Sequence, residues 1–592
     1  MITRLFDFVA KRVSEEPEAV MLAGKENGVY RTYSCRECWE LAGKLCGGLL
    51  SLGIRNQVLE PEQQEKIALI SPNRPEWLIT DLAVQQTGAV LTPLYPTISA
   101  HDLVYVLNEA EVRILFIANA DMYERFKDAF AQVPTLQHVF SYDEIAGVTN
   151  WKELINKNLQ PDSSIVNRIT GDTLATIIYT SGTTGNPKGV MLRHDNIVSN
   201  VLDCECEFWF AIKGDRALSF LPLNHIFEKM VSYIYLNAGV SIYYAESMDT
   251  IGDNLKEVKP IVFTTVPRLL EKVYEKILAK GMELKGVKRA LFFWALNLGF
   301  KYDNVNHGSA WYRFQLGLAN KLIFKKWREA LGGNVKAIVT GAAACQQRLI
   351  RVFSSANITI MEGYGLTETS PVISVNKFRS EDRRVGTIGP VIQNVEVKLA
   401  EDGEISCKGR NVMMGYYKNP QLTAEVLDKD GWFKTGDIGE WVEGRFLKIT
   451  DRKKEIFKTA GGKYVAPQVV ENKMKESPFI EQIMVIGSGR KFVSALIVPS
   501  VLNIRKYMKD HDMPAAPDSN EALVKMPEVI DLIQKQVDKF NPLFSHPEQI
   551  KKFALLPNEW TIDGGEMTPT IKLKRKVIEQ KYAGVIEGIY GE

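Results

Sequence analysis

The sequence predicts an α/β protein with a large N-terminal domain of parallel or mixed sheets and helices, a small β-barrel-like subdomain, and a small α+β C-terminal domain. Helical and strand patterns alternate through residues 1–170, which is typical of βαβ units and a largely parallel sheet. After about Gly386 the pattern becomes all-β, and around 451–454 the chain becomes densely charged. A chain of 592 residues is also too long for a single hydrophobic core, because such cores rarely grow past ~250–300 residues.

The N-terminal part carries regular apolar periodicities. Apolar residues at helical spacing predict a helix at 38–52, with Gly53 as its stop signal. A second helix is predicted at 77–88. Short apolar runs predict buried strands at 66–70, 89–93, 112–118, 177–179, 262–265 and 337–340.

The predicted secondary structure changes in the C-terminal part of the chain. Alternating apolar residues and glycine turns predict short strands at 395–398, 404–408 and 445–449. We place a domain boundary at the charged run that follows, so the predicted domains are 1–450 and 451–592. Strands at 482–487 and 494–499 and a helix at 529–540 suit a small α+β unit.

Composition and charge exclude several classes of protein. Lys and Arg number 73 against 71 Asp and Glu, and this balance gives no reason to expect a nucleic-acid partner. Charges interrupt the N-terminus too early for a secretory signal, and no run of ~18 apolar residues predicts a membrane span. We therefore expect a cytoplasmic protein, with peripheral attachment to the inner face of the membrane left open.

Seven cysteines are scattered along the chain. Cys35 and Cys38 form a C-x-x-C pair, but no second pair follows at the spacing of a zinc site. Buried, reduced thiols are the favoured interpretation for this pair and for Cys204 and Cys206.

Residues 276–330 are basic and aromatic. They hold eleven Lys and Arg against three Asp and Glu, with aromatic residues between them. Two interpretations stay open: amphipathic helices packed on the main domain, or a surface that contacts anionic lipid.

A segment rich in Gly, Ser and Thr, from Tyr179 to Val190, follows a predicted strand. Glycines allow a backbone to fold closely around phosphate, hydroxyls add donors, and Lys188 adds a mobile positive charge. The segment matches neither a Walker A nor a dinucleotide-binding pattern. It predicts a phosphate-binding loop.

This loop resembles the phosphate-loop signature of the adenylate-forming (AMP-binding) superfamily, and the resemblance recurs in order along nearly the whole chain. The further motifs that carry it are Leu221-Pro222-Leu223-Asn224-His225, Val266-Pro267-Arg268, Gly341-Ala342-Ala343, Tyr364-Gly365-Leu366-Thr367-Glu368-Thr369, Trp432-Phe433-Lys434-Thr435-Gly436-Asp437, Asp451-Arg452-Lys453-Lys454, Lys458 with Gly461-Gly462-Lys463, and Thr568-Pro569-Thr570-Ile571-Lys572. The resemblance implies activation of a carboxylic acid by ATP, with a mobile C-terminal domain.

Roles follow from the resemblance residue by residue. It implies Thr183 and Glu368 as ligands of Mg²⁺, and Lys572, Glu368, Lys188 and His225 as catalytic residues. Asp437 would accept hydrogen bonds from the ribose, Lys454 would be the hinge, and Gly461 and Gly462 would line the route of the pantetheine arm of coenzyme A. The full set expected to bind nucleotide or coenzyme A is Thr180, Ser181, Gly182, Thr183, Thr184, Gly185, Lys188, Gly341, Ala342, Ala343, Tyr364, Gly365, Thr367, Asp437, Arg452, Lys454, Gly461 and Gly462.

Two of these assignments carry an alternative. Many relatives have Gly immediately before the C-terminal lysine, whereas this chain has Ile571 before Lys572. That departure leaves the register of the motif open. His225 is equally consistent with a buried structural histidine.

The C-terminal motif, the Val266-Pro267-Arg268 segment and the basic, aromatic segment 276–330 resemble those of long-chain fatty acyl-CoA synthetases. The implied substrates are ATP with Mg²⁺, a fatty acid and coenzyme A. Association of the chain as a homodimer stays open. Phe208, Trp209 and Phe210 suit either the mouth of an acyl tunnel or an ordinary core. Two other functions stay open: acyl transfer to a carrier-protein thiol, and a catalytically silent lipid- or nucleotide-binding homologue.

Overall fold

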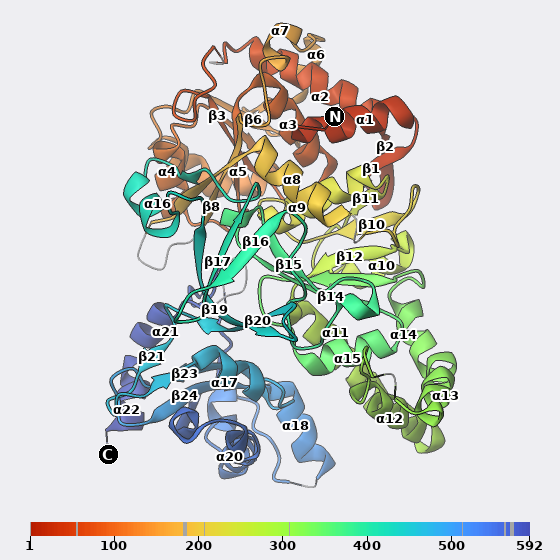
Figure 1. Cartoon of the computed structure of the whole chain (residues 1–592), viewed down its shortest axis with the longest axis vertical. Coiled ribbons are helices and arrows are strands. Elements are labelled where there is room, and N and C mark those ends of the chain that lie inside the picture. Colours follow the sequence, from red (N-terminus) through yellow and green to blue (C-terminus); the bar gives the residue numbers. More distant parts are fainter. Residues whose placement is uncertain are drawn as a thin grey trace. The chain divides into compact units, whose positions relative to one another are not determined.

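The computed structural model describes residues 2–54, 57–180, 186–205, 208–306, 308–511, 513–561, 564–568 and 573–591 (Figure 1). The described chain forms two compact units. Unit 1 comprises Met1–Val397, Cys407–Lys434 and Glu443–Phe446, and unit 2 comprises Lys398–Ser406, Thr435–Val442 and Leu447–Glu592. The predicted α/β class is confirmed. The predicted boundary at 450/451 stays a prediction.

The first large sheet of unit 1 has the strand order β18-β9-β8-β4-β3-β5-β6-β7. From β8 to β7 the neighbouring strands are parallel, whereas β9 runs antiparallel to both β8 and β18. Its strands are β3 (Lys66–Ile70), β4 (Val90–Leu94), β5 (Ile114–Ile117), β6 (His138–Ser141), β7 (Thr149–Asn150), β8 (Leu174–Thr180), β9 (Lys188–Arg193) and β18 (Gly415–Tyr416).

The second large sheet has the order β15-β14-β13-β12-β10-β11-β1-β2. From β14 to β1 the neighbouring strands are parallel, and β15 and β2 form the two edges in antiparallel pairing with β14 and β1. Its strands are β1 (Val20–Glu26), β2 (Val29–Ser34), β10 (Arg216–Ser219), β11 (Ser241–Tyr244), β12 (Val262–Thr265), β13 (Ala337–Thr340), β14 (Thr359–Gly365) and β15 (Val372–Val375).

Helices cover these sheets because parallel strands are joined by helical crossovers. In the first sheet α4 and α5 share a core with β3, β4, β5 and β8. The helices of unit 1 are α1 (Leu5–Glu15), α2 (Cys35–Leu50), α3 (Pro75–Thr87), α4 (Ala100–Glu109), α5 (Ala120–Phe130), α6 (Lys152–Asn156), α7 (Ser163–Val166), α8 (His194–Glu205), α9 (Ile226–Asn237), α10 (Ile251–Val258), α11 (Pro267–Glu283), α12 (Gly286–Phe300), α13 (Ala310–Ala319), the π-helical turn η1 (Asn320–Phe324), α14 (Lys325–Ala330), α15 (Gln347–Ser355), the 3₁₀ turns η2 (Thr367–Thr369) and η3 (Ser380–Asp382), and α16 (Pro420–Val426).

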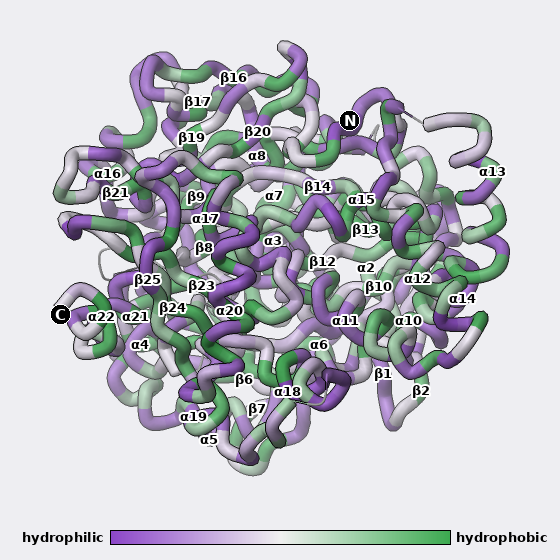
Figure 2. The backbone as a smooth tube through the Cα atoms, turned by 90° about the horizontal axis from the view of Figure 1, so that it is seen from below, coloured by the Kyte–Doolittle hydropathy of each residue, from purple (hydrophilic) through white to green (hydrophobic). Residues whose placement is uncertain are grey.

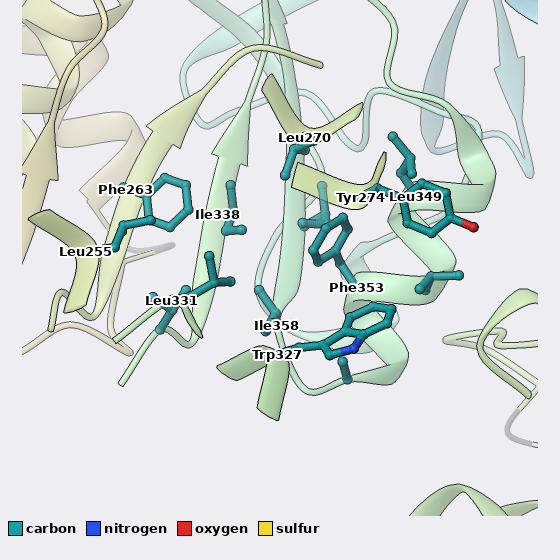
Figure 3. Close-up of a cluster of buried hydrophobic side chains, with 14 of the residues drawn as sticks. Leu255, Phe263, Leu270, Tyr274, Trp327, Leu331, Ile338, Leu349, Phe353 and Ile358 are labelled. Atoms are coloured by element: carbon teal, nitrogen blue, oxygen red, sulfur yellow. The ribbon is translucent and has the colours of Figure 1, made fainter. Parts of the chain in front are cut away.

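A second hydrophobic core lies under the other large sheet (Figure 3). Side chains of β12 and β13, such as Phe263 and Ile338, meet Leu270 of α11, Trp327 of α14 and Phe353 of α15 there. An apolar cavity of about 20 Å³ lies within this core. That volume suffices for roughly one water molecule.

A small sheet with the order β16-β17-β19-β20 stands where the sequence predicts the β-barrel-like subdomain. The division between the two units runs through its strands. They are β16 (Val395–Leu399), β17 (Glu404–Gly409), β19 (Phe433–Val442) and β20 (Phe446–Arg452).

Unit 2 has its own α+β core. Its main sheet has the order β23-β24-β25. Alternate side chains of these strands pack against α17, α18 and α20, and the remaining ones pack against α21 and α22. Its elements are β21 (Phe457–Lys458), β22 (Tyr464–Val465), α17 (Pro467–Met474), β23 (Ile480–Ile486), β24 (Val493–Pro499), α18 (Val501–Asp510), α19 (Asn520–Leu523), α20 (Pro527–Phe540), the 3₁₀ turns η4 (Asn541–Leu543) and η5 (His546–Glu548), β25 (Ile550–Leu555), α21 (Arg575–Lys581) and α22 (Ala583–Tyr590).

The described helices and cysteines bear on the expectations about a membrane span and a redox or zinc site. No described helix has the length and apolar character needed to cross a bilayer. Cys35 and Cys38 lie buried on α2, and no disulfide joins any of the described cysteines. Burial raises the pKa of both thiols, which disfavours the thiolate that redox or zinc chemistry needs. Cys206 lies outside the described residues.

A buried ion-pair network ties the first turn of α21 to the rest of unit 2. The Arg575 guanidinium donates to Glu455 at 3.1 Å, to the Val485 carbonyl at 3.0 Å, and to Glu471. Burial raises the pKa of Glu471, and the charge of Arg575 opposes that rise. Without Arg575, two carboxylates would share a poorly solvated site.

We therefore expect Arg575→Ala to destabilise unit 2 by about 3 kcal/mol, because removing one partner of a buried pair leaves the other uncompensated. Hydrogen exchange of β23 and β24 reports the opening of this unit, and it should accelerate by roughly a hundredfold. Lys535→Ala is the matched control, since Lys535 pairs with Asp531 on the exposed face of α20. In this control variant, hydrogen exchange of β23 and β24 should differ from the wild-type rate by less than about threefold. Equal exchange in the two variants would contradict a structural role for the network.

Candidate functional site

Parallel pairing gathers sequence-distant motifs of unit 1 at one edge of the second large sheet. In the paired strands β10, β12, β13 and β14, equivalent positions include Leu218 beside Phe263, Thr265 beside Thr340, and Thr340 beside Glu362. The motifs continue directly from the carboxyl ends of these strands, and ligands of open α/β sheets bind at such edges. The segments concerned are 221–225 after β10, 266–268 after β12, 341–343 after β13 and 364–369 at the end of β14.

The strip Gly341-Ala342-Ala343 has an unusual backbone. Ala342 has φ = 67°, in the left-handed region that residues with a Cβ rarely adopt. Just beyond it, the backbone N–H of Cys345 donates to the buried carboxyl of Glu362 at 2.7 Å. Burial raises the pKa of Glu362 to about 7. Such strain persists only where surrounding contacts hold it, and it is common at ligand sites.

The Tyr364–Thr369 segment is tightly constrained. A Cβ on Gly365 would lie 1.7 Å from the carbonyl oxygen of Pro371, so only glycine fits there. Tyr364 and Thr367 are buried, and Glu368 lies half-buried in η2. The motif therefore presents Glu368 from a rigid turn.

Tyr416 of β18 holds Glu368 in place. Its hydroxyl donates to the Glu368 carboxylate at 2.8 Å, and the Met413 N–H donates to the Glu368 carbonyl at 2.9 Å. Burial and the nearby Glu368 charge raise the pKa of Tyr416, which keeps it a donor. Sequence reasoning missed Tyr416, although the pair Tyr416-Tyr417 before a helix was a visible signal.

Lys188 joins the same group of side chains. It begins β9, pairs with Thr180 at the end of β8, and places its ammonium 4.8 Å from the centre of the Tyr416 ring. The predicted phosphate loop thus connects two antiparallel strands. Its residues Ser181, Gly182, Thr183, Thr184 and Gly185 lie outside the described residues.

His225 caps a helix. Its Nδ1 accepts a hydrogen bond from the Phe227 N–H at 3.2 Å at the start of α9. This geometry fits the structural alternative, and a gating role stays a prediction. Phe208 and Phe210 are buried and stacked with each other at 5.6 Å, whereas Trp209 is exposed. Their packing matches the core interpretation for the two phenylalanines.

Unit 2 carries a second group of predicted binding residues. Asp437 of β19 is 3% exposed and pairs with Arg452 at 3.2 Å. The Asp437 N–H donates to the Thr435 hydroxyl at 3.1 Å, and that hydroxyl donates to the Ile405 carbonyl at 2.7 Å. A fixed carboxylate with a neighbouring guanidinium suits a sugar hydroxyl beside a phosphate.

The predicted hinge and the loop after it are exposed. Lys454 lies in a turn directly after β20. Gly461 and Gly462 form the turn between β21 and β22, and Gly462 has φ = 76°. Thr570, Ile571 and Lys572 lie outside the described residues, whereas Thr568 lies within them.

The donor set suits Mg²⁺ shared with substrate phosphates. Across the described residues, no cluster of three or more His, Cys, Asp or Glu side chains could enclose a metal ion. Mg²⁺ is usually held by one or two carboxylates together with phosphates and water. The half-buried Glu368, kept in place by Tyr416, meets that requirement.

Comparisons with known proteins agree along the whole chain. The profile described as AMP-binding enzyme matches residues 9–417, and the one described as AMP-binding enzyme C-terminal domain matches residues 455–592. The long-chain-fatty-acid–CoA ligase FadD15 of Mycobacterium bovis is 34% identical over 98% of this chain and 95% of its own. The long-chain-fatty-acid–CoA ligase 5 of Rattus norvegicus is 32% identical over 96% of this chain and 85% of its own.

Solved structures share the fold. The anthranilate CoA ligase AuaEII, solved with anthranoyl-AMP, superposes with a TM-score of 0.74 at 16% identity over 98% of both chains. A Mycobacterium tuberculosis fatty acyl CoA synthetase gives 0.64 at 19% identity over 98% of this chain and 99% of its own. With the profile matches and the full-length relatives, these findings establish that the chain belongs to the AMP-binding (adenylate-forming) enzyme family.

Proposed function

We propose that the protein is a long-chain fatty acid–CoA ligase. It uses ATP to convert the acid to an acyl-adenylate, releasing pyrophosphate, and then transfers the acyl group to coenzyme A, releasing AMP. The observation that carries the proposal is the gathering of the family motifs at one sheet edge, with Glu368 fixed by Tyr416. Relatives named long-chain-fatty-acid–CoA ligases, matched over almost the full chain, support the substrate class.

The first half-reaction needs a poor electrophile to be activated. The carboxylate oxygen attacks the α-phosphorus of ATP, and pyrophosphate leaves with the electron pair of the broken P–O bond. Negative charge spreads over the phosphates in this step, so catalysis depends on positioning and electrostatic stabilisation. Mg²⁺, held by Glu368 and Thr183, would supply positive charge to the phosphates.

The residues of this chain supply the rest of the binding. The glycine- and hydroxyl-rich loop and Lys188 receive the phosphates, and Tyr364 with the 341–343 strip receives adenine. Asp437 accepts hydrogen bonds from the ribose, while Arg452 stands beside it at 3.2 Å. Lys572 contacts the reacting carboxylate and α-phosphate as a compact positive charge.

The second half-reaction is attack of a thiol on the acyl-adenylate. The thiol sulfur forms the thioester bond, its proton is lost, and AMP leaves with the electron pair. We expect a change of backbone angles at Lys454 between the two steps, so that the first step uses Lys572 and the second uses Gly461 and Gly462. The exposed position of Lys454 between β20 and β21 suits such a change of backbone angles.

The chain-length range and the acceptor test this proposal together. AMP release is measured with saturated acids from acetate to the longest common fatty acids, with either free coenzyme A or a phosphopantetheinylated carrier protein as acceptor. We expect turnover to rise steeply towards the long acids, and to require free coenzyme A. Turnover with a carrier alone would reassign the acceptor, and no turnover with any acid would support a silent homologue.

Tyr416→Phe tests the positioning of the metal ligand. Phe keeps the ring beneath Lys188 but loses the hydroxyl that donates to Glu368, so we expect the Mg²⁺ concentration needed for half-maximal activity to rise roughly tenfold. Tyr417→Phe is the matched control, since within the described residues the Tyr417 hydroxyl has no hydrogen-bond partner. A Mg²⁺ dependence equal in both variants would remove the role assigned to Tyr416.

The two half-reactions separate the roles of Lys572 and Lys454. Lys572→Ala should slow acyl-adenylate formation at least about a hundredfold while sparing thioester formation from supplied acyl-adenylate. Lys454→Pro should do the reverse, because proline fixes φ at the hinge. Lys576→Ala is the control, and it should keep the two steps within about threefold of wild type. Loss of both steps in Lys572→Ala, or normal overall turnover in Lys454→Pro, would contradict these roles.

A further inference from the structure

The helix formed by α13 and the π-helical turn η1 has apolar residues on two opposite faces. Its inner face packs on the core shown in Figure 3, through Tyr312, Leu316, Ala319 and Ile323. A surface helix normally carries a single apolar stripe, and the opposite face is polar. This helix departs from that rule.

The outer face exposes large apolar side chains. Trp311 and Phe314 are each 64% exposed, Leu318 is 40% exposed and Leu322 is 44% exposed. Positions 311, 314 and 318 follow the spacing of one helical face, and Leu322 continues it one turn further. The rings of Trp311 and Phe314 are stacked at 5.5 Å. We call these four residues the outer apolar face.

Basic side chains flank this face. Residues 284–330 hold nine Lys and Arg against two Asp and Glu, in a chain whose total charges almost cancel. Arg313, Lys321, Lys325 and Lys326 are exposed on the same helical segment. In Figure 2, hydrophobic and hydrophilic stretches alternate along α13 and α14. Figure 1 shows α12 and α13 side by side, beyond α15.

We propose that the outer apolar face, with its basic flanks, docks on an anionic lipid bilayer. Trp, Phe and Leu enter the boundary between headgroups and acyl chains, and Lys and Arg meet the lipid phosphates. Contiguous exposed apolar residues mark an interaction site. Tryptophan is favoured at that boundary because its ring is apolar and its N–H is polar.

The charge distinguishes lipid from a second copy of the chain. A symmetric dimer would set this face against itself, since a two-fold interface uses the same patch on both subunits. The basic flanks would then face each other and repel. A surface of lipid phosphates carries the opposite charge over its whole area, so it fits the flanks as well as the apolar face.

Sedimentation with sucrose-loaded vesicles tests this proposal in the full-length chain without any substrate, so its outcome does not depend on the proposed function. We expect binding to phosphatidylcholine vesicles that contain about 30% phosphatidylglycerol, and weak binding to phosphatidylcholine alone. About 0.5 M NaCl should weaken the binding, because salt screens the basic flanks.

The variant Trp311→Ser with Phe314→Ser should lower vesicle affinity at least about tenfold. Trp441→Ser is the control, since Trp441 is another exposed tryptophan on β19. Unchanged circular dichroism and an unchanged thermal unfolding midpoint confirm that the double variant is folded. Undiminished vesicle binding by the double variant, or no binding by the wild type, overturns the proposal. A wild-type dimer that the double substitution dissociates, with no vesicle binding, assigns the face to a second copy instead.

Discussion

Parallel pairing of β10, β12, β13 and β14 is the constraint on which the site in unit 1 depends. The strands belong to segments between residues 216 and 365, and their hydrogen-bonded register aligns their carboxyl ends. Segments separated by more than a hundred residues thereby continue from one edge. A sheet whose central strands are largely buried can hold strained or crowded backbone such as that of Ala342 and Gly365.

Within each unit taken by itself, proposed site residues are held in place by other protein groups. Tyr416 restrains Glu368, and Thr435 positions the backbone of Asp437. Preorganisation of this kind matters for phosphoryl chemistry, because the protein contributes mainly by placing charges where negative charge develops. Tyr416 lies on β18, and the pairing of β18 with β9 also brings the Tyr416 ring close to the Lys188 ammonium.

Several strands were predictable because they are buried on both faces. Strands β3, β12 and β13 occupy the residues predicted from continuous apolar runs. Helix α3 begins two residues earlier than predicted, since Pro75 is favoured at the first helical position, and it ends before Gly88, which adopts φ = 77°.

Other features depend on contacts between distant segments. Tyr416 acquires its role only when β18 pairs with β9, and His225 reveals its capping hydrogen bond only in three dimensions. The outer apolar face was visible as aromatic and basic composition, but its separation from the inner face required the packing of α13. The interpretations of 276–330 as packed helices and as a lipid surface are therefore compatible, one for each face.

Fatty-acid-dependent exchange of labelled pyrophosphate into ATP, measured without coenzyme A, reports whether the protein forms an acyl-adenylate. The exchange requires reversible formation of a bound acyl-adenylate. We expect exchange that needs both Mg²⁺ and a long-chain acid and that disappears when either is omitted. Absence of exchange with every acid, or release of ADP in place of pyrophosphate, would contradict it.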